Sequence, residues 1–140
     1  AEEYRQQRKK EFSQLYANLG VHFGEYTKEE SDPAILAGLR ACRDANFLGE
    51  DDINQMRYDY LMMLNKPKVA EGIFRANTIL YPNSPNVFDS YGEALLVNGD
   101  DKASLKNYEK AVEIATKNES ESLELYRQNL EKVKQELQKR

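Results

Sequence analysis

Few residues in this sequence are of a type that could carry nucleophilic or metal chemistry, and they do not form a set. His22 is the single histidine and Cys42 is the single cysteine. A zinc centre takes about three or four ligands from histidine, cysteine and carboxylates, and a reactive thiol needs an adjacent base. We therefore expect His22 to be an ordinary loop histidine and Cys42 to be a small buried hydrophobic residue.

Paired carboxylates are present, but they stand where helices are expected to begin. They are Glu29-Glu30, Glu50-Asp51-Asp52 and Asp100-Asp101. At those places acidic side chains cap the first turn and interact favourably with the helix dipole. Acid–base catalysis instead needs two carboxylates that converge across a cleft, and the sequence also lacks the glycine-rich, Gly-x-Ser-x-Gly, Cys-x-x-Cys and His-Glu-x-x-His motifs. We predict that the chain is not itself an enzyme and holds no metal and no cofactor.

The bulk composition describes one globular domain. The chain has 140 residues, of which 31% are charged and 40% hydrophobic, and its net charge is −4. This length is sufficient to bury a core. A nucleic-acid partner is not expected, because such a binder needs a positive footprint. No apolar run approaches the ~20 residues that cross a bilayer, so we predict no membrane span.

Apolar residues recur at helical spacing along most of the chain, which predicts an all-α fold of about seven helices. The expected helices are residues 2–19, 33–48, 51–64, 67–80, 85–97, 101–118 and 119–140. Gly20 is expected to end the first helix, and residues 20–31 to form a loop. Asp32-Pro33 is expected to start the second helix, because a capping carboxylate precedes a proline at the first helical position.

Three of these helices are amphipathic and leave a choice of role. In the first, a basic cluster is either a solvated face or a contact for phosphate or an acidic membrane. In the third, apolar residues at helical spacing continue the helix. In the last, a narrow stripe indicates either a helix that caps the fold or a coiled-coil partner. The cluster and stripes are Arg5, Arg8, Lys9 and Lys10; Ile53, Met56, Tyr60, Leu61 and Leu64; and Leu123, Tyr126, Leu130, Val133 and Leu137.

Residues 85–118 carry a helix–turn–helix pattern of small and aromatic residues. Its positions are Phe88, Tyr91, Gly92 and Leu95, then a break at Asn98-Gly99-Asp100, then Ser104, Tyr108 and Ala111. The pattern resembles the tetratricopeptide repeat (TPR). The resemblance implies that two helices approach closely at Gly92.

A second copy is found 34 residues upstream, which is the period of the TPR family. Ala70, Phe74 and Pro82 match the second helix of that copy, whereas Arg57-Tyr58 replaces the large–small pair of its first helix. The resemblance implies a TPR-like α-solenoid with a degenerate repeat at 51–84 and a good repeat at 85–118. Residues 1–50 would then be an N-terminal helical pair and loop packed on the repeats, and 119–140 a capping helix, in one compact domain that we expect to be a fragment of a longer chain.

The TPR resemblance implies a concave groove lined by the first helix of each repeat. The candidate partner-binding residues are Gln55, Asp59, Met62, Met63, Asn86, Asp89, Glu93 and Leu96, with Met56, Ser90 and Val97 on the same faces. Acids, amides and an apolar floor suit a polypeptide with basic and apolar side chains. The alternative is that the N-terminal helix or an attached domain fills the groove.

The implied function is non-catalytic: an interaction module that docks a protein or peptide. Some TPR proteins clamp the C-terminal carboxylate of chaperones, but Gln55, Asp59, Asp89 and Glu93 occupy the corresponding positions here, and the three carboxylates among them would repel such a ligand. The alternative follows from Phe74-x-x-Asn77 and LYPNSPNVFDSYGEALLVNGD, which look like the C-terminal repeat module of bacterial serine β-lactamase-like or esterase-type hydrolases. In that case the chain is an accessory domain of an absent catalytic domain, exported or periplasmic if its hydrolase is exported and otherwise cytoplasmic.

Overall fold

A computed structural model describes all 140 residues and contains helices but no strand. The α-helices are α1 (Glu2–Gly24), α2 (Lys28–Asp44), α3 (Glu50–Arg57), α4 (Pro67–Leu80), α5 (Pro85–Val97), α6 (Asp101–Lys117) and α7 (Leu123–Gln138), and a π-helical segment η1 (Tyr58–Met63) continues α3. The predictions of an all-α fold and of seven helices are confirmed.

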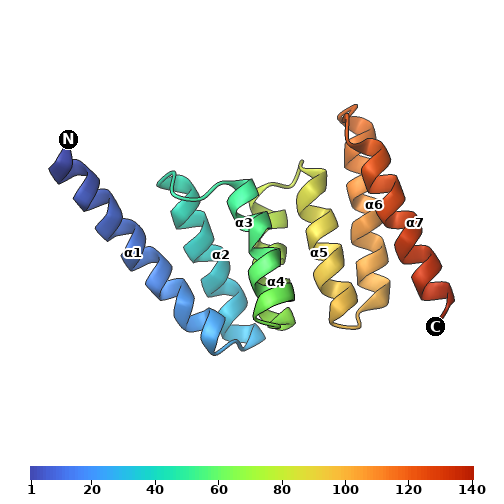
Figure 1. The fold of residues 1–140 in the computed structure, drawn as a ribbon, viewed down its shortest axis with the longest axis horizontal. Helices are drawn as coiled ribbons and strands as arrows, with labels where there is room; N and C mark the ends of the chain where they lie inside the picture. The colour runs from blue at the N-terminus through green and yellow to red at the C-terminus, as the bar shows by residue number, and fades with distance from the viewer.

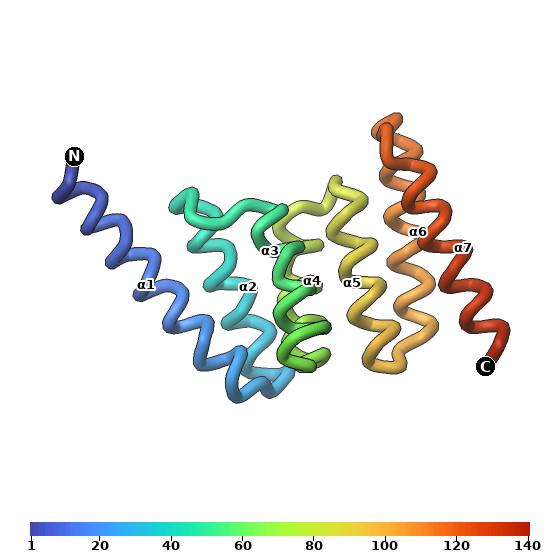
Figure 2. The backbone as a smooth tube through the Cα atoms, in the orientation of Figure 1, coloured from blue at the N-terminus to red at the C-terminus, as the bar shows by residue number.

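The helices follow one another in a row, each running roughly opposite to the one before it (Figure 1). The chain progresses from α1 to α7 without returning, so its two termini lie at opposite ends of an elongated molecule (Figure 2). Helix α4 packs against α2, α3 and α5, and α7 packs on α6 at the far end. This order brings α3, α5 and α7 to one side of the molecule.

The main core is built around α4. Pro67 occupies its first turn, where the missing N–H costs no hydrogen bond, and apolar residues then recur at helical spacing. Ile73 and Phe74 are fully buried, and they meet Ile35 of α2 and Ile53 of α3 in one cluster. Truncating a buried phenylalanine such as Phe74 to alanine costs about 3–5 kcal/mol of stability, so this cluster holds the centre of the row together.

The close approach expected at Gly92 is present. A Cβ atom at Gly92 would lie 2.8 Å from Cδ2 of Tyr108, and the Ser104 hydroxyl donates to the Gly92 carbonyl at 2.7 Å. The α5–α6 turn contains Gly99 at φ +83°, in the left-handed region that favours glycine. Helices α5 and α6 are therefore held together where the sequence pattern placed their contact.

The predicted boundary between the first two helices is wrong. Helix α1 continues through Gly20 to Gly24, because Leu19 and Phe23 carry its buried stripe one turn further. His22 therefore lies on α1 and not in a loop, and α2 already begins at Lys28. Pro33 therefore lies inside α2, where it removes the N–H that would bond the carbonyl four residues earlier.

Two further differences concern the third and last helices. The predicted 51–64 helix changes to π-type hydrogen bonding, in which the Leu64 amide donates to the Asp59 carbonyl at 2.7 Å. Leu64 is consequently 55% exposed. The last helix begins at Leu123 and not at residue 119. It buries Tyr126 and Val133, and Tyr126 packs against alanines of α6.

Candidate functional site: a polar groove along α5

A groove of about 510 Å³ runs along α5, between α3 on one side and α7 on the other. Its lining is mostly polar and includes both acids and bases. The lining residues are Asn54, Gln55, Arg57, Tyr58, Asn86, Asp89, Ser90, Glu93, Leu96, Tyr108, Leu125, Asn129, Lys132, Val133 and Glu136. We refer to it below as the α5 groove.

The α5 groove is lined by most of the residues that we expected to face a groove. Gln55 comes from α3, and Asn86, Asp89, Glu93 and Leu96 come from successive turns of α5. Because side chains three or four residues apart share a helix face, these α5 positions present one stripe to the groove. No residue of α1 lines it, so the N-terminal helix does not fill the α5 groove.

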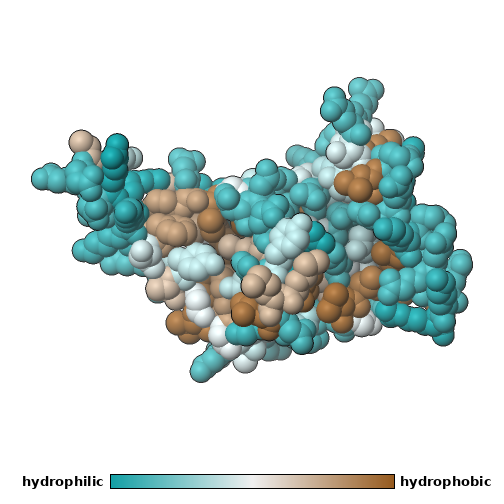
Figure 3. Space-filling view, viewed as in Figure 1, coloured by the Kyte–Doolittle hydropathy of each residue, from teal (hydrophilic) through white to brown (hydrophobic).

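Asp59, Met62 and Met63 lie outside the α5 groove, on the neighbouring π-helical segment. Met62 is 61% exposed and Met63 is 79% exposed, and Asp59 is exposed as well. Figure 3 shows brown and tan atoms gathered over this part of the surface. Met56, in contrast, is buried in the core and not available to a partner, so its placement on the concave face was wrong.

Arg57 and Glu93 form the strongest polar contact of the α5 groove. The guanidinium donates from Nε at 2.9 Å and from NH2 at 2.7 Å to the two oxygens of the carboxylate. Both side chains are about one-third exposed, and the paired hydrogen bonds raise the pKa of Arg57. Glu93 is therefore neutralised within the protein and is not the free acid that we expected.

Asp89, one turn before Glu93, has no such partner. Its carboxylate accepts only from Nδ2 of Asn129 on α7, at 3.2 and 3.3 Å, and it forms no ion pair. Burial raises the pKa of Asp89 to about 6. The Asn129 hydrogen bond and the nearby charge of Arg57 oppose this rise, and the charge of Glu93 adds to it. The α5 groove thus holds one satisfied carboxylate and one that is costly to ionise.

Amide side chains complete the polar lining. Asn54 of α3 is 4% exposed, and its Oδ1 accepts from Nδ2 of Asn77 at 3.2 Å. The Nδ2 of Asn54 has no acceptor in the protein. A buried donor without a partner costs about 1–3 kcal/mol, so this edge of the α5 groove is under-satisfied in the free chain.

The sequence analysis did not predict that α7 contributes to the α5 groove. Leu125, Asn129, Lys132 and Glu136 form one wall of the α5 groove, whereas residues 119–140 were expected only to cap the last repeat. Their spacing of four, three and four residues places them on one helix face, and that periodicity is the signal that could have identified the wall.

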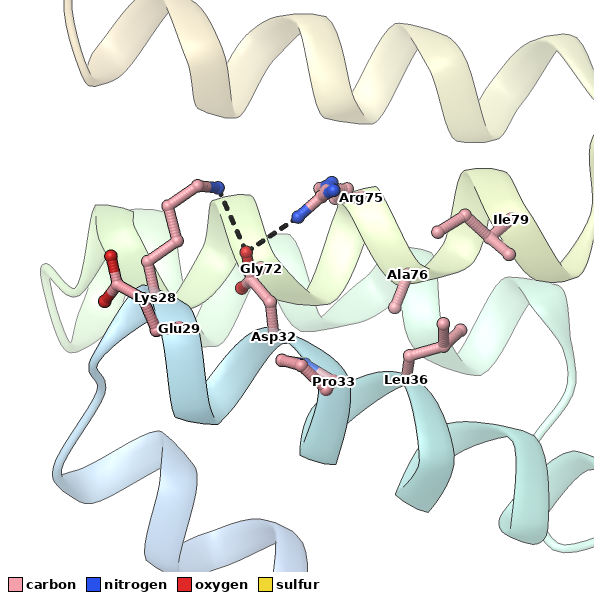
Figure 4. A pocket seen from close by; sticks show the side chains of 9 residues that line it. All are labelled: Lys28, Glu29, Asp32, Pro33, Leu36, Gly72, Arg75, Ala76 and Ile79. Carbon is pink, nitrogen blue, oxygen red and sulfur yellow. Dashed lines mark hydrogen bonds and ion pairs between the residues drawn. The ribbon is translucent and has the colours of Figure 1, made fainter.

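A second hollow lies between α2 and α4 and is internally satisfied (Figure 4). Asp32 accepts from the Tyr26 hydroxyl at 2.5 Å, from Lys28 Nζ at 3.0 Å and from an Arg75 nitrogen at 2.9 Å. Burial opposes ionisation of Asp32, but these donors and cations together hold its pKa below the usual value. Gly72 makes the contact possible, because a Cβ there would lie 2.8 Å from Oδ1 of Asp32. We refer to this site as the α2–α4 hollow.

The structure contains no group of three or more histidine, cysteine, aspartate or glutamate side chains arranged to hold a metal ion. None of its helices combines the length and the apolar character needed to cross a membrane. Comparison with protein-family models, with curated proteins and with solved structures gives no match.

Proposed function

We propose that this chain is a non-catalytic protein-docking module built from TPR-like helical repeats, and that it docks a polypeptide in the α5 groove. The main observation in support is that the alternate helices α3, α5 and α7 line one groove. The polar groups of this groove have only part of their hydrogen bonds within the chain. The contact of Gly92 with Tyr108 and the hydrogen bond from Ser104 support the repeat assignment, because they fall at positions of the family pattern.

The lining suits a main chain better than it suits a small metabolite. Gln55 and Asn86 each offer an amide donor and an amide acceptor, the two groups that a peptide backbone needs, and Asn129, whose Nδ2 donates to Asp89, offers an acceptor. Leu96 and Leu125 add apolar surface beside them. Hydrogen bonds of this kind hold a polypeptide in place, while apolar contacts supply much of the affinity.

A second candidate function is that of an accessory domain that packs on a catalytic domain of a hydrolase. The observation in its favour is the exposed apolar surface of the π-helical segment, formed by Tyr58, Met62, Met63 and Leu64 and hereafter called the η1 patch. Exposed apolar groups that lie together on a surface mark contacts with other proteins. In this version the docked polypeptide is another domain of the same parent chain.

The docking proposal is tested by selecting random linear peptides on the intact 140-residue chain. Gln55→Trp places a bulky ring at the groove wall, and Lys106→Trp places the same ring on an exposed position of α6 outside the groove. We expect peptides selected on the natural chain to lose at least tenfold in affinity for Gln55→Trp and to bind Lys106→Trp unchanged. Peptides that bind both variants equally would show that docking does not use the α5 groove.

A further inference from the structure

The α5 groove contains a carboxylate without an ion-pair partner, although the nearby charge of Arg57 acts to lower its pKa. Asp89 forms no ion pair, and its single polar partner is the neutral amide of Asn129. The one cation on α3, Arg57, is committed to Glu93 by two hydrogen bonds. A carboxylate that is largely withdrawn from water is stabilised most effectively by a cation that shares its cavity.

The walls around Asp89 suit the stem of a long basic side chain. Tyr108 of α6, Leu96 of α5 and Leu125 of α7 line the same cavity and supply aromatic and aliphatic surface. Lysine and arginine bury such stems along apolar surface while their charged ends reach a polar group. The cavity therefore combines the two features that a basic side chain requires.

The remaining charged groups that face the cavity come from α7. They are Lys132 and Glu136, one cation and one anion, and neither forms an ion pair with Asp89. Glu93 is paired with Arg57, and Glu136 is paired with Arg140 at 3.5 Å, so Asp89 is the acid of this cavity that has no ion-pair partner in the chain.

We propose that the α5 groove receives a lysine or arginine side chain of the docked polypeptide, with its cationic end on Asp89 and its stem against Tyr108 and Leu125. This assignment rests on the docking function proposed above and names the residue type that the groove selects. Asp89 is then a specificity-determining residue, because an apolar side chain of the same length would leave its charge uncompensated.

The pH dependence of binding follows from the same geometry. A bound cation favours the ionised carboxylate, so it lowers the pKa of Asp89 from its free value of about 6. Affinity is therefore expected to be constant above about pH 7 and to fall as Asp89 takes up its proton below about pH 6.

The test uses the capped peptides acetyl-Gly-Lys-Gly-amide, acetyl-Gly-Arg-Gly-amide and acetyl-Gly-norleucine-Gly-amide with the intact chain. Binding is followed by NMR through the side-chain amide of Asn129, which contacts Asp89. We expect saturable shifts with the lysine and arginine peptides and at least tenfold weaker binding of the norleucine peptide. Asp89→Asn should abolish the difference, whereas Glu109→Gln, an exposed acid on α6, should leave it unchanged.

Several outcomes would overturn the assignment. Equal binding of the lysine and norleucine peptides would do so, as would a lysine preference that persists in Asp89→Asn or that does not weaken between pH 7 and pH 5 in the natural chain. The last measurement needs no variant, so a folding defect in Asp89→Asn does not remove the test. If selected peptides depend on Gln55 but show no preference for basic residues, the docking function stands and this inference fails. If the basic probes bind at Asp89 but no peptide is selected, Asp89 binds a cation and the docking function fails.

Discussion

The α2–α4 hollow and the α5 groove each place a carboxylate between helices, but the two carboxylates differ in how many donors and cations surround them. Asp32 receives a hydroxyl, an ammonium and a guanidinium, and its pKa is held below the usual value. Asp89 receives one amide, and its pKa is raised to about 6. The first carboxylate joins α2 to α4, while the second keeps hydrogen-bonding capacity that the chain itself does not use.

Under the docking proposal, this difference separates a structural carboxylate from one that awaits a partner. A carboxylate with a complete set of donors stabilises the fold and has little capacity for a partner. A carboxylate that lacks a cation lowers the stability of the free chain, and binding of a cation returns that free energy. Four predictions test this distinction, and they are ordered by the size of the expected effect.

The largest effect is expected at the α2–α4 hollow. Asp32→Ala removes the acceptor of Tyr26, Lys28 and Arg75, and it should lower the free energy of unfolding by about 2–3 kcal/mol, since hydrogen bonds to a charged group are the strong ones. Urea denaturation provides the measurement. Asp44→Ala, which removes a carboxylate whose side chain is 61% exposed, is the matched control and should change stability by less than about 0.5 kcal/mol. Similar losses in both variants would show that Asp32 is not a structural link.

A smaller effect is expected for the Arg57–Glu93 pair. Because the pair is half-buried and bidentate, the single variants Arg57→Gln and Glu93→Gln should each cost about 1–2 kcal/mol. The double variant should cost less than the sum of the two, which a double-mutant cycle in urea measures. Strict additivity would mean that the pair contributes nothing and that Glu93 is free to bind a partner.

Asp89→Asn should raise the free energy of unfolding, whereas the preceding substitutions lower it. In the folded chain the Asp89 carboxyl keeps its proton to about pH 6, whereas in the unfolded chain it loses it near 3.8, so stability falls as pH rises between these values. Asparagine cannot ionise, and with allowance for partial exposure the variant should be about 1 kcal/mol more stable at pH 7.5. At pH 4 the two proteins should unfold at nearly the same temperature. A variant that is destabilised at pH 7.5 would place Asp89 with Asp32 as a structural carboxylate.

The smallest effect is expected at Asp59, which is exposed beside the η1 patch. Asp59→Asn should change stability by less than about 0.5 kcal/mol. Its expected effect is kinetic: basic peptides should associate more slowly at low salt, and the difference should disappear as salt screens the charge. Stopped-flow association at two salt concentrations checks this, and identical rates at low salt would remove Asp59 from the docking surface.

Local signals in the sequence predicted the central helices well. Pro67 and Pro85 begin α4 and α5, and the Asp100 carboxylate caps α6 by accepting from the Ala103 amide at 3.3 Å. These signals act within one turn of the chain, so a single sequence contains them. Gly20 was misleading because tertiary packing of Leu19 and Phe23 outweighed the local preference for a break. Pro33 was also misleading, because it lies inside α2 and does not begin it.

The sequence predicted which helix faces line the candidate site, but not the hydrogen bonds and ion pairs between its residues. Helical periodicity assigned Gln55, Asn86 and Leu96 to one side of their helices, and they line the α5 groove. The partners that decide the charge of its two acids are 36 and 40 residues away along the chain, in the Arg57–Glu93 and Asp89–Asn129 contacts. No spacing rule in one sequence identifies such pairs, since they depend on how whole helices are placed.

The π-helical segment η1 has the geometry that results when one extra residue is inserted into an α-helix. In continuous α-helical bonding Leu64 would lie one turn after Tyr60 on the stripe that begins at Ile53, and it would be buried. The wider turn rotates Leu64 outward and leaves Met62 and Met63 beside it on the surface. Deleting one residue between Tyr58 and Met63 should return Leu64 to the core and shrink the η1 patch. A chain shortened in this way would gain stability and lose the exposed surface, so the length of this helix, more than its composition, determines whether the molecule has an apolar face to offer.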